Sequence, residues 1–141
     1  MTKFMISLLL ILVFVLAACG GQSEGSESIV GTTWHWQAFL DMADENNITV
    51  SNPENYTLTL MDDGTANIQA DCNQVTWTYE LDGSVLKFNT LGPSTLAFCG
   101  EDSLDTQYLQ RLGDTATYIL SDGQLSLNLI YDSGDMVFSP E

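Results

Sequence analysis

Three cysteines and one histidine are the side chains of this 141-residue chain with the greatest capacity for chemistry. His35 lies between Trp34 and Trp36, and a histidine can serve as a general base near neutral pH. No serine or cysteine nucleophile stands beside it, so we expect His35 to be a wall or surface residue of a strand. The sequence also lacks a phosphate-binding loop. It therefore predicts no catalytic residues and a protein that is not an enzyme.

The first cysteine, Cys19, follows a segment that differs from the rest of the chain. Lys3 is the only basic residue of this segment, and an apolar run broken by a single serine covers residues 4–18. A short basic start, an apolar stretch and small residues at its end are the layout of a secretory signal peptide. A transmembrane helix needs about 20 apolar residues, so the run is shorter than is typical of one. Residues 1–18 are therefore predicted to be a signal peptide.

The sequence Leu16-Ala17-Ala18-Cys19-Gly20 resembles the lipobox of bacterial lipoproteins. In that family the cysteine sulfur forms a thioether with diacylglycerol, and the signal peptide is cleaved just before the cysteine. The resemblance implies lipidation of Cys19 and a membrane anchor, with the domain facing the periplasm or the cell exterior. Two acyl chains anchor stably, since each buried methylene contributes about 0.8 kcal/mol. An ordinary cleaved signal with a chance cysteine, or an uncleaved anchor, is the alternative.

The residues that follow the predicted lipid site separate it from the domain. After Cys19, residues 20–28 are glycine, serine, glutamine and glutamate, without one apolar side chain. This composition is typical of a flexible tether. We therefore expect the lipid site and tether at residues 19–28 and the folded domain at residues 29–141.

The charge of the mature chain limits its partners. Nineteen acidic and two basic residues follow Cys19, which gives a formal net charge of −17. Nucleic acid requires a basic surface and is excluded as an expected partner. Anionic lipid headgroups would also repel the domain, so the lipid on Cys19 is its predicted link to the membrane. The charge fits simple solubility, and it also fits a protein partner that is cationic.

With Cys19 assigned to lipid, Cys72 and Cys99 remain. Two cysteines in an exported domain favour one disulfide bond, with two buried thiols or half of a metal site as alternatives. A structural zinc site is not expected, since the chain has no Cys-x-x-Cys motif and a single histidine. The acidic segment 41–55 is long for a connection and is either functional or mobile. It lacks the EF-hand spacing, so we expect no metal and no cofactor.

These residues must be positioned by short segments in which apolar and polar residues alternate. Period two with one apolar face is typical of half-buried strands. Strands are predicted at residues 34–40, 56–60, 66–70, 75–81, 86–88, 118–120, 125–129 and 136–138. In the first of them, the predicted apolar face consists of Trp34, Trp36, Ala38 and Leu40. Trp77 is the third tryptophan, and we expect all three to fill a core rather than to line a pocket.

Turn and helix signals complete the predicted fold. Asp-Gly pairs at 63–64, 82–83 and 122–123, and Ser133-Gly134-Asp135, stand between predicted strands and favour tight hairpins. Residues 103–112 have apolar side chains at helical spacing, with Ser103 as the expected N-cap and Gly113 at the end. We therefore expect a mostly β fold, in which an antiparallel meander closes into a small barrel-like sheet and one short α-helix covers its open end.

The order of these motifs resembles the META domain family, also called HslJ-like, over nearly all of the mature chain. The shared motifs are Gly31-Thr32-Thr33-Trp34, the strand and Asp-Gly turn at 56–64, Ala70-Asp71-Cys72-Asn73, a strand at 94–99, the helix at 105–112 and Met136-Val137-Phe138. The resemblance implies a compact, barrel-like antiparallel fold with one helix and no catalytic residues. Many members have glycine where this chain has Asp71, which affects the expected local turn.

The family also suggests a kind of function. Many members are lipoproteins or periplasmic proteins, and some are linked to heat shock, antibiotic tolerance or virulence. We therefore expect a non-enzymatic lipoprotein that supports envelope stress tolerance or assembly through protein contacts. The alternative is a binding module that inhibits a cationic extracellular enzyme or holds a small apolar ligand. The sequence assigns no ligand-binding residues.

Overall fold

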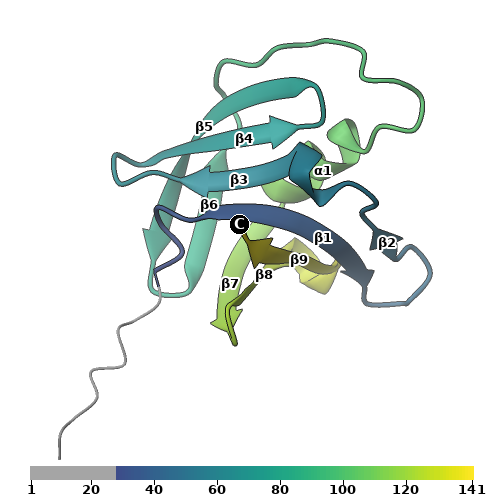
Figure 1. Ribbon diagram of the computed structural model, residues 1–141. Helices are drawn as coiled ribbons and strands as arrows, with labels where there is room; N and C mark the ends of the chain where they lie inside the picture. The colour runs from purple at the N-terminus through teal and green to yellow at the C-terminus, as the bar shows by residue number, and fades with distance from the viewer. Residues whose placement is uncertain (1–27) are drawn as a thin grey trace, which may run out of the picture.

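The computed structural model describes residues 28–141, which form one antiparallel sheet that closes on itself (Figure 1). The strand order is β2-β1-β3-β4-β5-β6-β7-β8-β9, and β1 also pairs with β9. The strands are β1 (Thr33–Asp41), β2 (Ile48–Thr49), β3 (Tyr56–Leu60), β4 (Thr65–Ala70), β5 (Asn73–Asp82), β6 (Val85–Asn89), β7 (Thr115–Ser121), β8 (Gln124–Leu129) and β9 (Gly134–Pro140). Eight of them form the closed barrel, so the predicted mostly β, barrel-like meander is confirmed. The predicted signal peptide and Cys19 lie outside the described residues.

The acidic segment 41–55 is more structured than a loop. It contains β2 and a single 3₁₀ turn, η1 (Pro53–Asn55). Strand β2 pairs with Ala38 and Phe39 of β1, on the same edge that β3 occupies at the beginning of that strand. Two residues are too few to produce a periodic pattern, which is why the sequence does not reveal β2.

A bulge in β1 corrects the apolar face predicted for that strand. The register of β1 against β9 shifts between Trp36 and Ala38. One extra residue moves every following side chain to the other face of the sheet. Phe39 therefore lies in the core, while Leu40, which alternation assigns to the core, is 48% exposed.

The tight turns agree with the Asp-Gly pairs. Gly64, Gly83 and Gly123 all have positive φ and lie at the β3–β4, β5–β6 and β7–β8 connections. Asp71 has a φ of +57° in the β4–β5 turn, at the position where many META domains have glycine. The left-handed conformation is therefore kept although the residue is aspartate, which tolerates it better than most side chains.

The helix α1 (Asp105–Gly113) closes one end of the barrel, but its ends differ from those predicted. Its N-cap is Leu104, whose side chain makes no capping bond, while the hydroxyl of Ser103 accepts a hydrogen bond from the Asp105 amide at 3.2 Å. Gly113 is the last helical residue rather than the residue after the helix, which is Asp114. The α-helix therefore begins two residues later than Ser103, because the chain before it is held by other contacts described below.

Aromatic rings from four elements fill the covered end of the barrel. Tyr108 of α1 is fully buried, and its ring lies 5.0 Å from that of Trp36 in a stacked arrangement. It also meets Tyr56 edge-on at 5.6 Å and lies 6.4 Å from Phe138. Trp34, Trp36 and Trp77 are all buried in the core, as expected of residues that fill a small barrel. Among residues 28–141, no helix is long and apolar enough to cross a membrane.

The two ends of the barrel differ in what they carry. The N-terminal end holds Ser28 and the β3–β4, β5–β6 and β7–β8 turns. Ser28 lines a shallow cavity there together with Leu120, Gly123 and Pro140. The opposite end, called the disulfide end below, holds the β4–β5 turn, α1 and the connection from β6 to α1. Figure 1 shows this connection as the long green trace above the sheet, away from the beginning of β1.

Candidate functional site

The β6–α1 loop (residues 90–104) is the longest connection without a strand or helix of its own in the described chain. It runs along an edge of β5 that β6 leaves open, since β6 pairs with β5 only from Thr78 onward. The amide of Thr76 donates to the Pro93 carbonyl at 2.9 Å, and the amide of Thr95 donates to the Gln74 carbonyl at 3.0 Å. The loop therefore takes the place of a paired strand and is held along its first half.

A glycine allows this close approach. A side chain at Gly92 would clash with the Thr76 carbonyl oxygen and would also touch the Trp77 ring. The loop backbone can therefore lie against β5 at this point only because Gly92 has no Cβ atom.

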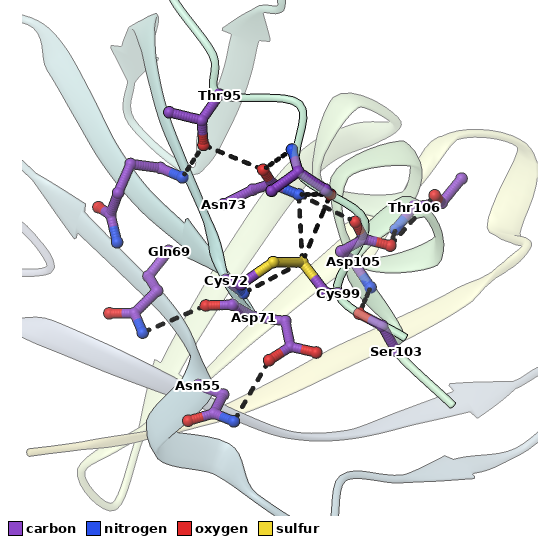
Figure 2. The surroundings of a disulfide bond; sticks show 12 residues. Asn55, Gln69, Asp71, Cys72, Asn73, Thr95, Cys99, Ser103, Asp105 and Thr106 are labelled. Carbon is purple, nitrogen blue, oxygen red and sulfur yellow. Dashed lines mark hydrogen bonds between the residues drawn. A yellow bond between two sulfur atoms is a disulfide. The ribbon is translucent and has the colours of Figure 1, made fainter. Parts of the chain in front are cut away.

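The side chain of Asn73 holds the second half of the loop (Figure 2). Asn73 is buried at the start of β5. Its Oδ1 accepts from the Ala97 amide at 2.8 Å and from the Thr95 hydroxyl at 3.0 Å. Its Nδ2 donates to the Ala97 carbonyl at 3.0 Å and to the Asp105 carboxylate at 3.2 Å. One amide therefore links the loop, the barrel and the first turn of α1.

A disulfide between Cys72 and Cys99 closes the same region, which confirms the predicted pairing and excludes two free thiols (Figure 2). The Cα atoms are 5.5 Å apart, and the two residues are separated by 27 positions in the sequence. Both cysteines lie at least partly at the surface of the disulfide end. The bond fixes the loop to the β4–β5 turn directly before α1 begins.

The β4–β5 turn is tied to α1 by a second route. The hydroxyl of Tyr56 donates to the Asp71 carboxylate at 3.3 Å and accepts from the Leu104 amide at 3.0 Å. The amide of Asp71 donates to the Asn55 carbonyl at 2.8 Å. Glycine could supply the same backbone amide, but it has no carboxylate to accept the hydrogen bond from Tyr56.

Residues 94–99 do not form the strand that the family resemblance implies. Only Ser94 forms an isolated bridge, to Val75. Backbone groups that would bond a neighbouring strand are bonded instead by the side chains of Asn73 and Thr95. The Asn73 side chain accepts from the Ala97 amide, and the Thr95 hydroxyl accepts from the Gln74 amide at 2.9 Å. The Thr95 side chain turns toward β5, where its hydroxyl bonds Asn73 and the Gln74 amide, whereas the side chains of Leu96 and Phe98 are exposed.

The outward residues of the loop are large and apolar. Leu96 is 93% exposed and Phe98 is 83% exposed, and Leu91 at the start of the loop is 87% exposed. Single exposed apolar residues are common on protein surfaces. Here, however, two of them lie on a segment whose backbone is bonded to the barrel and closed by a disulfide. The loop therefore presents apolar side chains in a fixed position.

A cleft of about 470 Å³ lies beside these side chains. Its lining includes the apolar Leu96 and Phe98, called its apolar wall below, and the acidic Glu101 and Asp105, called its acidic wall. No basic residue lines it. The cleft therefore combines an apolar wall with a negatively charged one.

A second cleft, of about 510 Å³, lies between α1 and the β1–β2 connection. Arg111 points into it, with its guanidinium carbon 4.2 Å from the centre of the Phe39 ring. Partial burial lowers the pKa of Arg111, while Asp41 and Asp114 favour its charged form. The lining mixes both charges with amide side chains, so it shows no clear preference for one kind of ligand.

Catalytic or metal-binding groupings are not found in residues 28–141. His35 lies on β1, with Thr57 of β3 and Ser139 of β9 beside it, and it is partly exposed. No three His, Cys, Asp or Glu side chains in the described part of the chain come together as a possible metal site. In the acidic segment, Asp41 is occupied by hydrogen bonds from the Ala43 amide and the Asn46 side chain, which lower its pKa.

Sequence reasoning identified Cys72 and Cys99 but missed the other residues of this site. Asn73 is a polar residue next to a cysteine, and nothing in the sequence shows that its side chain is buried. Leu96 and Phe98 were assigned to an ordinary strand. The sequence pattern that could have identified Leu96 and Phe98 is apolar alternation in a segment that follows Gly92-Pro93 and has no hairpin partner.

The fold and this site together define a small closed β-barrel whose helix and disulfide-bonded loop cover one end. Residues 27–140 match the META domain, so the chain belongs to the META domain family. This confirms the family that the sequence motifs implied.

Solved structures show the same fold. The NMR structure of a protein from Burkholderia xenovorans has a TM-score of 0.64 and 22% identity, covering 80% of this chain and 83% of that one. The crystal structure of a DUF4847 family protein from Bacteroides vulgatus has a TM-score of 0.58 and 14% identity, covering 79% of this chain and 93% of that one. At these identities the similarity concerns the fold alone. No curated protein matches the chain significantly.

Proposed function

We propose that this chain is a membrane-anchored envelope lipoprotein whose META domain is not an enzyme and supports stress tolerance or assembly by contacting other proteins. The lipid is attached to Cys19 in the lipobox-like sequence. The observation that carries the proposal is the fixed exposure of Leu96 and Phe98 on the β6–α1 loop. Exposed apolar side chains on a backbone that hydrogen bonds and a disulfide hold in place are typical of a surface that a partner covers.

The anchor and the site are compatible in position. The described chain begins at the N-terminal end of the barrel, whereas the β6–α1 loop lies at the disulfide end. A domain linked to a membrane through its N-terminus can therefore keep the loop available to proteins in the surrounding space.

The alternative in which the barrel holds a small apolar ligand has less support. The three tryptophans that could line such a site are buried and packed in the core. The indole N–H groups of Trp34 and Trp36 also donate hydrogen bonds to the backbone carbonyls of Ile29 and Ala38.

A deletion strain tests the proposal. The strain is expected to become more sensitive to heat and to envelope-active antibiotics, and the intact gene should restore tolerance. Restoration should fail with Leu96→Ser/Phe98→Ser but succeed with Ile119→Ser, which changes an exposed apolar residue of β7 away from the loop. Unchanged sensitivity of the deletion strain, or full restoration by the loop variant, would contradict the proposal.

The anchor is tested separately. The mature protein from a bacterium that processes lipoproteins should carry an acyl mass on Cys19, and Cys19→Ser should release it from the membrane fraction. A mature protein without this added mass would contradict the lipid assignment while leaving the domain's contacts open to the test above.

A further inference from the structure

We propose that the partner binds the β6–α1 loop through a cationic amphipathic segment, in which basic side chains lie beside apolar ones. This inference rests on the proposed function and adds the chemistry of the partner. It is argued from the two walls of the cleft at the disulfide end, one apolar and one acidic.

The apolar wall requires a partner with apolar side chains. Leu96 and Phe98 line the same cleft and are almost fully exposed. Their backbone is fixed by Asn73, by bonds to β5 and by the disulfide, so little further order is lost when a partner covers them. A preformed apolar surface of this kind binds a partner more favourably than a mobile surface does.

The acidic wall requires a partner with basic side chains. Glu101 and Asp102 follow Cys99 and Gly100 and are exposed, and Glu101 and Asp105 both line the cleft. No lysine or arginine occurs between Lys87 and Arg111, so no basic residue of the loop itself offsets these carboxylates. A basic side chain that reaches this wall while its apolar neighbours cover Leu96 and Phe98 would satisfy both walls.

Two other occupants fit the charge less well. A second copy of the chain would bring a surface of formal charge −17 against another of the same sign. A membrane with anionic headgroups would be repelled by the same carboxylates, and the loop lies at the end of the barrel opposite Ser28. A cationic segment of another protein is the occupant that both walls attract.

Binding of designed peptides to the full-length lipidated protein, held in discs of zwitterionic lipid, tests the inference. The probe is a helical peptide of leucine and lysine, with a leucine–glutamate peptide and a serine–lysine peptide as controls. Only the leucine–lysine peptide should bind well. Its affinity should fall about tenfold or more between about 0.05 M and about 0.5 M salt, since exposed charges are screened.

Two pairs of variants locate the binding. Glu101→Gln/Asp102→Asn should weaken binding about tenfold, while Asp62→Asn/Asp82→Asn, with the same charge change at the N-terminal end, should change it less than about twofold. Leu96→Ser/Phe98→Ser should weaken it at least about tenfold, and Ile119→Ser should not. Equal loss in the test and control pairs, or equal binding of the serine–lysine peptide, would show unspecific charge attraction and overturn the inference.

A photoreactive amino acid at position 96, used in intact cells, separates this inference from the proposed function. Crosslinks that map to a basic and apolar segment of a protein support both. Crosslinks to a protein segment without basic residues overturn the partner chemistry and leave the protein-contact function in place. Crosslinks only to lipid, or none to any protein, overturn both.

Discussion

At the scale of single residues, the Asn73 side chain bonds the β6–α1 loop at several points and so helps to position it. Its side chain offers an acceptor and a donor, and it satisfies both the amide and the carbonyl of Ala97. A carboxylate accepts but does not donate, and a lysine donates but does not accept. An amide side chain is therefore the group that this buried position requires.

This requirement predicts the effect of Asn73→Asp. The variant keeps the acceptor but loses the donor to the Ala97 carbonyl, and it places a carboxylate against Asp105. The free energy of unfolding should therefore fall by about 2–3 kcal/mol near neutral pH. The loss should shrink near pH 4, where a protonated acid can donate again. Urea unfolding at both pH values measures it. Gln74→Glu, an equal charge change at the exposed neighbour, should cost less than about 0.5 kcal/mol, and an equal cost would contradict the explanation.

Tyr108 differs from Asn73, because its ring packs well but its hydroxyl has no hydrogen-bond partner among the described residues. Burial raises the pKa of Tyr108 well above its ordinary value of 10.0. Tyr108→Phe keeps the ring and removes the unpaired hydroxyl, so it should stabilise the protein by about 1–2 kcal/mol. Thermal or urea unfolding measures this change, and a loss of stability would show that the hydroxyl has a partner such as buried water.

The same residue predicts a pH dependence. The folded protein keeps the phenol protonated, whereas the unfolded chain releases the proton above pH 10.0, the ordinary tyrosine value. The unfolded state then binds fewer protons, so stability should fall as the pH rises above this value. Tyr108→Phe should flatten this fall in unfolding experiments up to about pH 11. A slope identical to that of the unchanged protein would contradict the assignment to Tyr108.

At the scale of elements, the barrel positions the loop by leaving an edge open. Strand β6 pairs with only the second half of β5, and the loop backbone then occupies the first half. The β1 bulge acts in a similar way at the same end, since it turns Phe39 inward, under the guanidinium of Arg111. The two clefts of this domain therefore lie where regular pairing stops.

The disulfide should stabilise this arrangement through the chain it closes. A loop of 27 residues corresponds to about 3.6 kcal/mol in the chain-entropy description, so Cys72→Ser/Cys99→Ser should lower the unfolding free energy by about that amount. Denaturant unfolding of the oxidised protein and of the variant measures it. The control is the variant in reducing buffer, where no further loss is expected. A loss below about 1 kcal/mol would show that Asn73 and the β5 bonds hold the loop without the disulfide.

At the scale of the whole molecule, charge acts on stability as well as on partners. Nineteen acidic residues against two basic ones after Cys19 leave the folded domain repelling itself. Salt screens this repulsion, so the melting temperature should rise by a few degrees between about 0.02 M and about 0.3 M sodium chloride. Calorimetry with potassium chloride as a second salt checks that the effect is ionic strength. A melting temperature that stays level or falls would contradict it.

The sequence by itself determined the strands, most of the hairpins and the cysteine pair. Alternation locates a half-buried strand because side chains point to opposite faces, and Asp-Gly locates a turn because glycine accepts positive φ. These signals are local, so they remain readable without the fold. They predicted all eight barrel strands, while the cysteine count favoured the disulfide and the order of the motifs identified the META domain family.

Only the tertiary structure decided which side chains of β1 and of the β6–α1 loop are buried and which are exposed. The inward turn of Phe39 depends on a bulge set by β9, and the burial of Asn73 depends on a loop that returns more than twenty residues later. Leu96 and Phe98 fall in the strand that the family resemblance implies, yet the edge of β5 bonds their neighbours and leaves these two side chains exposed. Exposure is a property of the packed chain, because it depends on contacts between segments far apart in the sequence.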